Sequence, residues 1–150
     1  MDVAAALWGG IIGAIVAATV YAGFLGLRLT RFDLLRFEGG MLIHERTSMV
    51  YIYGVVLQVA GGALLALGYR LVFQQLDSAT LVGWGALLGL AQGVLGLLLL
   101  PLLGAVNRNV RAGDEPAPGL AGRVHGSLTP VALLVASVVF GTWVGIVLLP

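Results

Sequence analysis

Four long hydrophobic stretches, separated by short polar segments, account for most of the chain. The stretches cover residues 7–27, 48–73, 81–103 and 129–149. About 20 apolar residues in an α-helix are enough to cross the hydrocarbon core of a bilayer, which is about 30 Å thick. Because backbone groups inside lipid must satisfy their own hydrogen bonds, each stretch is expected to be a helix. The pattern therefore predicts an all-α fold, in which residues 1–150 form one domain, a four-helix transmembrane bundle.

The composition agrees with this architecture and removes several classes of function. Apolar residues make up 59% of the 150 residues and charged residues only 10%, which excludes a water-soluble fold. The chain contains no cysteine, so disulfides, thiolate metal sites and thiol nucleophiles are excluded. Motifs for zinc proteolysis, phosphate binding and acyl transfer are absent from the sequence. We therefore assign no catalytic residue, no metal site and no nucleic-acid partner.

Arginines are concentrated in two of the loops, and this predicts an orientation. Of the eight basic residues, four lie in residues 28–47 and three in residues 104–128. Arginine-rich loops stay on the cytoplasmic side of a membrane, so both of these loops are expected to be cytoplasmic. Both termini are then expected on the outer side of a prokaryotic inner membrane. Three tryptophans agree with this orientation, because Trp8, Trp84 and Trp143 all fall near the opposite ends of their helices.

The two arginine-rich loops differ in composition. In residues 30–37 of the first loop, aromatic and aliphatic side chains alternate with charges, until Gly39 and Gly40 break the run. We expect a short helix in the headgroup plane here, and an irregular loop is the alternative. The other loop is rich in glycine and proline, and residues 107–127 are expected to form a flexible linker. Pro101 is expected to kink or end the third long helix.

Small residues recur at every fourth position in three of the predicted helices. In lipid, no hydrophobic force pushes helices together, and small residues let their backbones approach closely. We expect these stripes to pack inside the monomer, with homo-oligomer or partner contacts as the alternative. The stripes contain Gly9 and Gly13 in the first helix, Gly85, Gly89 and Gly93 in the third, and Gly141 and Gly145 in the fourth.

Neutral polar residues lie near the middle of the predicted helices. They are Thr19, Gln58, Gln92 and Ser137, whereas no ionisable residue falls at mid-depth. The absence of mid-depth charges argues against ion pumps, proton-coupled carriers and voltage sensors. At 1.5 Å per residue, Gln58 and Gln92 each lie ~16 Å deep. We expect a layer of interhelical hydrogen bonds, each worth about 1 kcal/mol or less. A site for a polar ligand or water is the alternative.

Two histidines are the remaining candidates for binding chemistry. His44 and His125 each precede a returning helix on the same predicted side of the membrane. Two imidazoles at comparable depth could ligate a haem iron, so haem b is the one cofactor that we consider. Because His44 is followed by Glu45 and Arg46, we prefer to interpret both as ordinary interfacial histidines.

Several short motifs resemble those of small four-span prokaryotic membrane proteins from uncharacterised families. The resemblance implies a four-helix membrane fold and no activity. Such relatives often have a histidine just before the last motif, where Val138 or Val139 stands here, so no role for it is transferred. The matching motifs are Ala18-Thr19, the segment 29–35 with its arginine and aspartate, Leu100-Pro101-Leu102, and Phe140-Gly141 with Gly145.

These observations lead to one expected function and two alternatives. We expect a non-enzymatic integral membrane protein, an accessory or scaffolding subunit that packs against lipid and other membrane helices in a homo-oligomer or larger complex. One alternative is a haem-binding anchor of a respiratory-type electron-transfer complex, with His44 and His125 as ligands. The other is a small oligomeric facilitator with a neutral polar path through Gln58 and Gln92. Burial of these two amides against each other, without a cavity, would contradict it.

Overall fold

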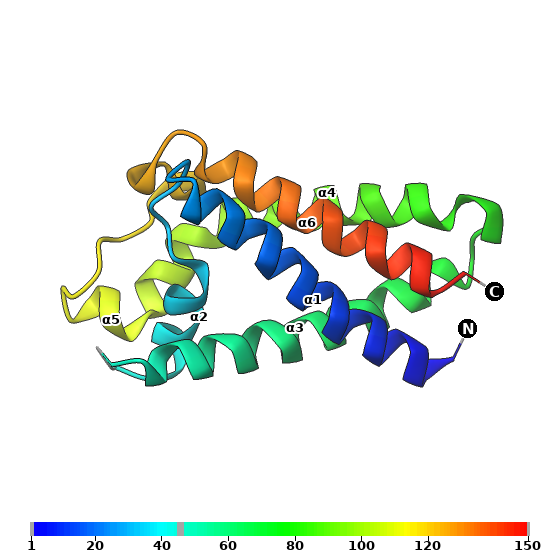
Figure 1. Ribbon diagram of the computed structural model, residues 1–150, viewed down its shortest axis with the longest axis horizontal. Coiled ribbons are helices and arrows are strands. Elements are labelled where there is room, and N and C mark those ends of the chain that lie inside the picture. Colours follow the sequence, from blue (N-terminus) through cyan, green and yellow to red (C-terminus); the bar gives the residue numbers. More distant parts are fainter. Residues whose placement is uncertain (1, 45–46, 150) are drawn as a thin grey trace.

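The computed structural model describes residues 2–44 and 47–149, and this part of the chain folds into helices without strands (Figure 1). Glu45 and Arg46, which the sequence places beside His44, lie outside it. Four helices are long and apolar enough to cross a bilayer, which confirms the four expected spans. They are α1 (Val3–Gly26), α3 (Met49–Phe73), α4 (Leu81–Val106) and α6 (Thr129–Val147). Pro101 lies inside α4 and does not end it.

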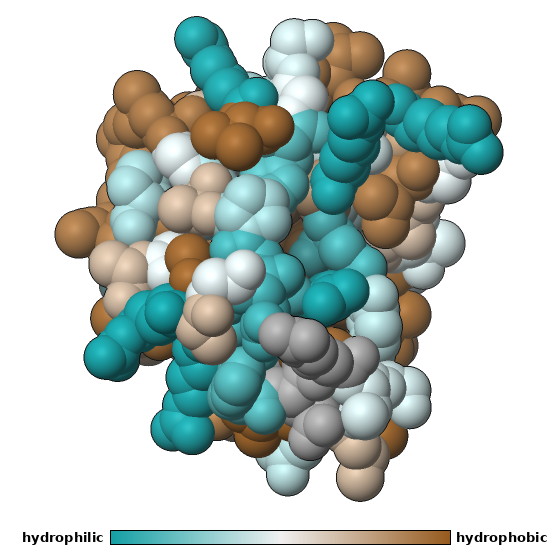
Figure 2. Space-filling view, turned by 90° about the vertical axis from the view of Figure 1, so that its left-hand side faces the viewer, coloured by the Kyte–Doolittle hydropathy of each residue, from teal (hydrophilic) through white to brown (hydrophobic). Residues whose placement is uncertain are grey.

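Four short elements connect the long helices. One of them, η1 (Ser78–Thr80), lies between α3 and α4. The other three are α2 (Leu34–Leu42), α5 (Arg108–Arg111) and η2 (Leu120–His125), and they lie together at the end of the bundle opposite the two termini (Figure 1). We call this the loop end, and the opposite one the termini end. Hydrophilic side chains gather on the loop end (Figure 2), as expected for a surface outside the hydrocarbon.

The four long helices form an open arc. Helix α1 packs on both α3 and α6, and α6 packs extensively on α4, whereas α3 and α4 meet only slightly. The order around the arc is therefore α3, α1, α6 and α4, and its open side lies between α3 and α4.

The contact between α4 and α6 is made by glycines. A Cβ atom on Gly85 would overlap the carbonyl oxygen of Gly141, and a Cβ on Gly89 would overlap that of Ser137. A Cβ on Gly145 would likewise come too close to the carbonyl oxygen of Leu81. This seam therefore requires glycine, since any side chain would push the two backbones apart. The other stripe residues also face neighbouring helices of the same chain, with Gly9 against Val147, Gly13 against Phe140 and Trp143, and Gly93 against Leu134 and Ser137.

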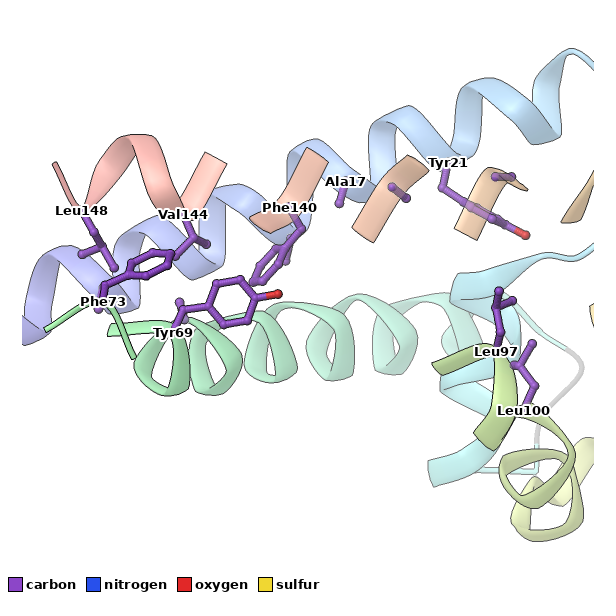
Figure 3. Close-up of a cluster of buried hydrophobic side chains, with 14 of the residues drawn as sticks. Ala17, Tyr21, Tyr69, Phe73, Leu97, Leu100, Phe140, Val144 and Leu148 are labelled. Atoms are coloured by element: carbon purple, nitrogen blue, oxygen red, sulfur yellow. The ribbon is translucent and has the colours of Figure 1, made fainter. Parts of the chain in front are cut away.

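Aromatic rings fill the core at the termini end (Figure 3). Tyr69 packs edge-on against Phe73 and Phe140, with ring centroids 5.9 and 5.8 Å apart. Val144 and Leu148 of the α6 segment complete the cluster, and all five side chains are buried. This half of the bundle is closely packed.

The first loop contains the expected short helix, α2, which packs against α3. A Cβ atom on Gly39 would overlap the carbonyl oxygen of Val50, and one on Gly54 would overlap that of Leu35. These close approaches place α2 against the first turns of α3. The sequence suggested that the two glycines Gly39 and Gly40 end the helix, but here they let it approach its neighbours closely.

Residues 107–127, expected to form a flexible linker, contain the short helices α5 and η2, with irregular structure over residues 112–119 between them. Asn107 is fully buried, and its Oδ1 atom accepts hydrogen bonds from the backbone N–H groups of Asn109 and Val110 at 2.9 and 3.1 Å. Its Nδ2 atom donates to the carbonyl oxygen of Phe37 at 2.7 Å, which ties α2 to α5. A buried hydrogen bond of 2.7 Å between the hydroxyls of Thr30 and Thr129 joins the first loop to the start of α6.

Candidate functional site

A cavity of about 410 Å³ lies inside the arc, in the half of the bundle nearer the loop end. All four long helices and α2 contribute to its wall. Its volume is within the range typical of small-molecule pockets, which are mainly apolar with a few polar groups. The apolar part of the wall includes Phe37, Leu57, Leu97, Leu100, Leu133 and Phe140.

Two glycines line the cavity where α3 and α4 leave the arc open. They are Gly61 of α3 and Gly96 of α4, and a Cβ atom on either would meet no other atom within 4 Å. Both residues therefore border empty space, in contrast to the glycines between α4 and α6.

Glu38 of α2 is the one ionisable residue among the described residues that line the cavity. Its two carboxyl oxygens lie 2.6 and 2.9 Å from the terminal amide of Gln58 on α3. A charged carboxylate requires the amide to turn its NH₂ group toward Glu38 as donor. A neutral carboxyl can instead donate its O–H to the amide oxygen. Gln58 can therefore serve either protonation state of Glu38.

Burial determines which state of Glu38 is favoured. The surrounding wall is apolar, and desolvation raises the pKa of the Glu38 carboxyl from 4.5 to about 8. The nearest arginine on the same helix, Arg36, does not offset this effect, because it forms an ion pair with Glu115 at the loop end. Burial therefore favours the protonated, neutral form of Glu38.

The polar residues expected at mid-depth do not form a single hydrogen-bonded layer. Gln58, Gln92 and Ser137 all line the cavity, but Gln92 accepts a hydrogen bond of 2.7 Å from the hydroxyl of Tyr69, whereas Gln58 contacts Glu38. Thr19 lies apart on an exposed face, where its hydroxyl donates to the carbonyl oxygen of Ile15 at 2.8 Å. The amides thus have different partners, because α2 brings the carboxyl group of Glu38, which was not among the expected site residues, to Gln58.

Phe37 separates the cavity from a second pocket of about 290 Å³ at the loop end. The second pocket is polar, and Phe37 lines both. The Phe37 ring lies 5.0 Å from that of Phe32, which in turn lies 4.9 Å from the imidazole of His125. Phe37 therefore lies between the two pockets, and Phe32 and His125 line the polar one. The charged residues of the polar pocket are Arg31, Asp33, Arg36, Asp114 and Glu115.

The structure places both histidines at the loop end, outside the cavity. The Nε2 atom of His44 lies 2.8 Å from a carboxylate oxygen of Asp114. His125 packs on Phe32, and desolvation lowers its pKa, an effect partly opposed by a hydrogen bond to the backbone of Pro116 and by the charge of Glu115. Within the described ranges, no three histidine or acidic residues gather as a metal-binding group.

Glu38 is the site residue that the sequence interpretation missed, although the sequence contains a signal for it. Leu34, Phe37, Glu38 and Met41 follow the spacing of one helical face, and all four line the cavity. A helix with an apolar face in which one position is acidic indicates a carboxyl group directed into the protein.

Comparisons with known proteins give no match to this chain, whether to protein-family models, to curated proteins or to solved structures. The four long apolar helices are compatible with a multi-pass membrane protein.

Proposed function

We propose that the protein is a non-enzymatic integral membrane protein that binds small, largely apolar molecules in its central cavity. The main support is the contrast within the bundle, where a cavity of about 410 Å³ adjoins a closely packed aromatic core. Apolar walls with one cluster of polar groups suit a molecule that is mostly hydrocarbon and carries a single polar group.

The open side of the arc supports entry from the lipid rather than from water. Helices α3 and α4 meet only slightly, and Gly61 and Gly96 leave space between them beside the cavity. At the loop end, by contrast, Phe37 separates the cavity from the polar pocket. The arginine-rich loop end would face the cytoplasm, as the positive-inside rule suggests.

Among the functions considered from the sequence, this proposal is nearest to the small facilitator. Gln58 and Gln92 line a cavity and are not buried against each other, which supports a polar path or binding site there. An accessory or scaffolding role has less support, since Gly85, Gly89 and Gly141 are occupied by contacts inside the monomer. Partner helices would have to dock on the lipid-facing surface.

A pair of leucine substitutions tests the proposal. Leucine at Gly96 would project into the cavity without meeting the backbone, and Gly83→Leu is the matched control because Gly83 also borders open space and is not part of the cavity wall. The measurement is saturable binding of radiolabelled para-methylbiphenyl to the protein in lipid nanodiscs, relative to empty nanodiscs. We expect saturable binding by the wild type and Gly83→Leu, and at least tenfold weaker binding by Gly96→Leu. Unchanged binding by Gly96→Leu, or no saturable binding by the wild type, would contradict the proposal.

A further inference from the structure

We propose that the cavity selects an amphiphilic monocation and exchanges it for the proton held by Glu38. This inference rests on the proposed function and specifies the class of ligand. It starts from a carboxyl group that has no counter-charge among the described residues of the cavity wall.

The other polar groups that line the cavity are neutral. Helix α3 contributes the amide of Gln58, α4 that of Gln92 and α6 the hydroxyl of Ser137, while α1 contributes only alanines. The titratable hydroxyl of Tyr69 is engaged with Gln92. Helix α5, which packs on α2, carries Arg108 and Arg111, but desolvation alone raises the pKa of Glu38.

The charged groups nearest to Glu38 along the chain have partners at the loop end. Arg36 pairs with Glu115, and Asp33 accepts a hydrogen bond of 2.8 Å from the hydroxyl of Tyr51. The negative charge of an ionised Glu38 is therefore not balanced by its surroundings, and an empty cavity favours the protonated form.

A bound cation would supply the missing counter-charge. When it lies beside Glu38, the ionised carboxylate becomes the favoured form. The carboxyl O–H bond then breaks, the proton leaves to bulk water, and the positive charge of the ligand takes its place. One proton is released for each monocation bound, so the net charge of the cavity does not change.

The remaining walls favour an organic cation over a metal ion. Hard metal ions need about six oxygen ligands, whereas the cavity offers one carboxyl group and a few neutral oxygens among apolar side chains. Phe37 and Phe140 line the same space, and aromatic faces attract organic cations.

The two pockets suggest separate routes for ligand and proton. The ligand has the open side between α3 and α4, whereas the polar pocket on the other side of Phe37 marks the direction of the loop end. An amphiphile from the lipid could therefore be exchanged for a proton from the loop end.

Two probes of the same shape test the inference. N-methyl-para-phenylpyridinium is a monocation, and para-methylbiphenyl is its neutral isostere. Titration calorimetry on the protein in nanodiscs, in buffers of different ionisation enthalpy, measures affinity and proton release together. Below a pH of about 8, we expect the cation to bind roughly tenfold more tightly for each unit of rising pH, with one proton released. Methylbiphenyl should show no increase in affinity as the pH rises.

Glu38→Gln identifies the group that exchanges the proton. This variant should bind the cation at least tenfold more weakly at a pH of about 8, without pH dependence, and should retain methylbiphenyl binding. Glu115→Gln, the same change at the loop end, should behave like the wild type. Since the wild-type proton count needs no variant, the test remains decisive even if Glu38→Gln does not fold.

The outcomes separate the two proposals. If methylbiphenyl binds saturably but cation binding releases no proton and does not tighten with pH, cation exchange is wrong and the binding cavity stands. If neither probe binds saturably, the proposed function itself fails.

Discussion

Glycine has opposite consequences in two seams of this bundle. Between α4 and α6, Gly85 and Gly141 bring two backbones into contact, and a side chain at either position would overlap the other helix. Between α3 and α4, Gly61 and Gly96 border a cavity, and a side chain there would meet nothing. Glycine therefore allows close contact where the two helices meet, as in α4 and α6. It leaves empty space where they are held apart, as in α3 and α4.

Helix α2 accounts for the difference between the seams. It packs along the first turns of α3, and the bond from Asn107 to the carbonyl oxygen of Phe37 ties it to α5 at the end of α4. We infer that α2 acts as a wedge that keeps α3 away from α4 near the loop end. At the termini end, where α2 does not reach, Tyr69, Phe73 and Phe140 fill the space instead.

The largest expected effect comes from leucine in the closed seam. Gly85→Leu would force α4 away from α6, and we expect a loss of at least about 3 kcal/mol of folding free energy or no folded protein. Gly83→Leu and Gly96→Leu place the same side chain in open space on the same helix and should retain the fold. Thermal unfolding of the three variants in detergent is the measurement. Equal stability of all three would remove the distinction between the seams.

The pH dependence of the folding free energy tests whether Glu38 is buried in the apolar cavity beside α3 and α4. Because the pKa of Glu38 rises from 4.5 to about 8 on folding, the folded state binds an extra proton between these values. Stability should therefore fall as the pH rises from about 4.5 to about 8, by roughly 3 to 5 kcal/mol in total. Glu38→Gln should remove this dependence. Denaturant unfolding of both proteins across this range would contradict the prediction if the two curves had the same slope.

Loss of the hydrogen bond from Asn107 to Phe37, which links α2 to α5, should have an intermediate effect on the folding free energy. Asn107→Ala removes the donor to the carbonyl oxygen of Phe37 and the acceptor that caps α5, so we expect a loss of roughly 2 kcal/mol. Asn107→Ser can still cap α5 and should lose about half as much. Chemical denaturation distinguishes the two variants. A loss that is the same for both would show that the tie to Phe37 contributes little.

The ion pair between Arg36 and Glu115 should matter least, because it lies near the surface of the loop end. Arg36→Gln should cost about 1 kcal/mol or less and leave probe binding in the cavity unchanged. A strong loss of binding would show that the loop-end charges control the cavity, contrary to the separation by Phe37.

The sequence predicted the four long helices because each is a continuous apolar run that is long enough to cross a membrane. The sequence did not predict the position of α2. Glu38 and its neighbours form a charged segment, and their burial depends on contacts of α2 with α3 and α5. Nor could the sequence predict the bond between Thr30 of the first loop and Thr129 at the start of α6, which joins residues 99 positions apart. The spacing of the glycines indicated that helices pack closely, but it did not show that α4 contacts α6 rather than α3.

The protonation state of Glu38 can be measured directly by infrared difference spectroscopy between the wild type and Glu38→Gln in lipid nanodiscs. At neutral pH, we expect the carbonyl band of a protonated carboxylic acid in the wild type, replaced by carboxylate bands as the pH rises through about 8. Carboxylate bands that persist in the wild type down to a pH of about 5 would show a hydrated, charged side chain, and would contradict an apolar cavity around Glu38.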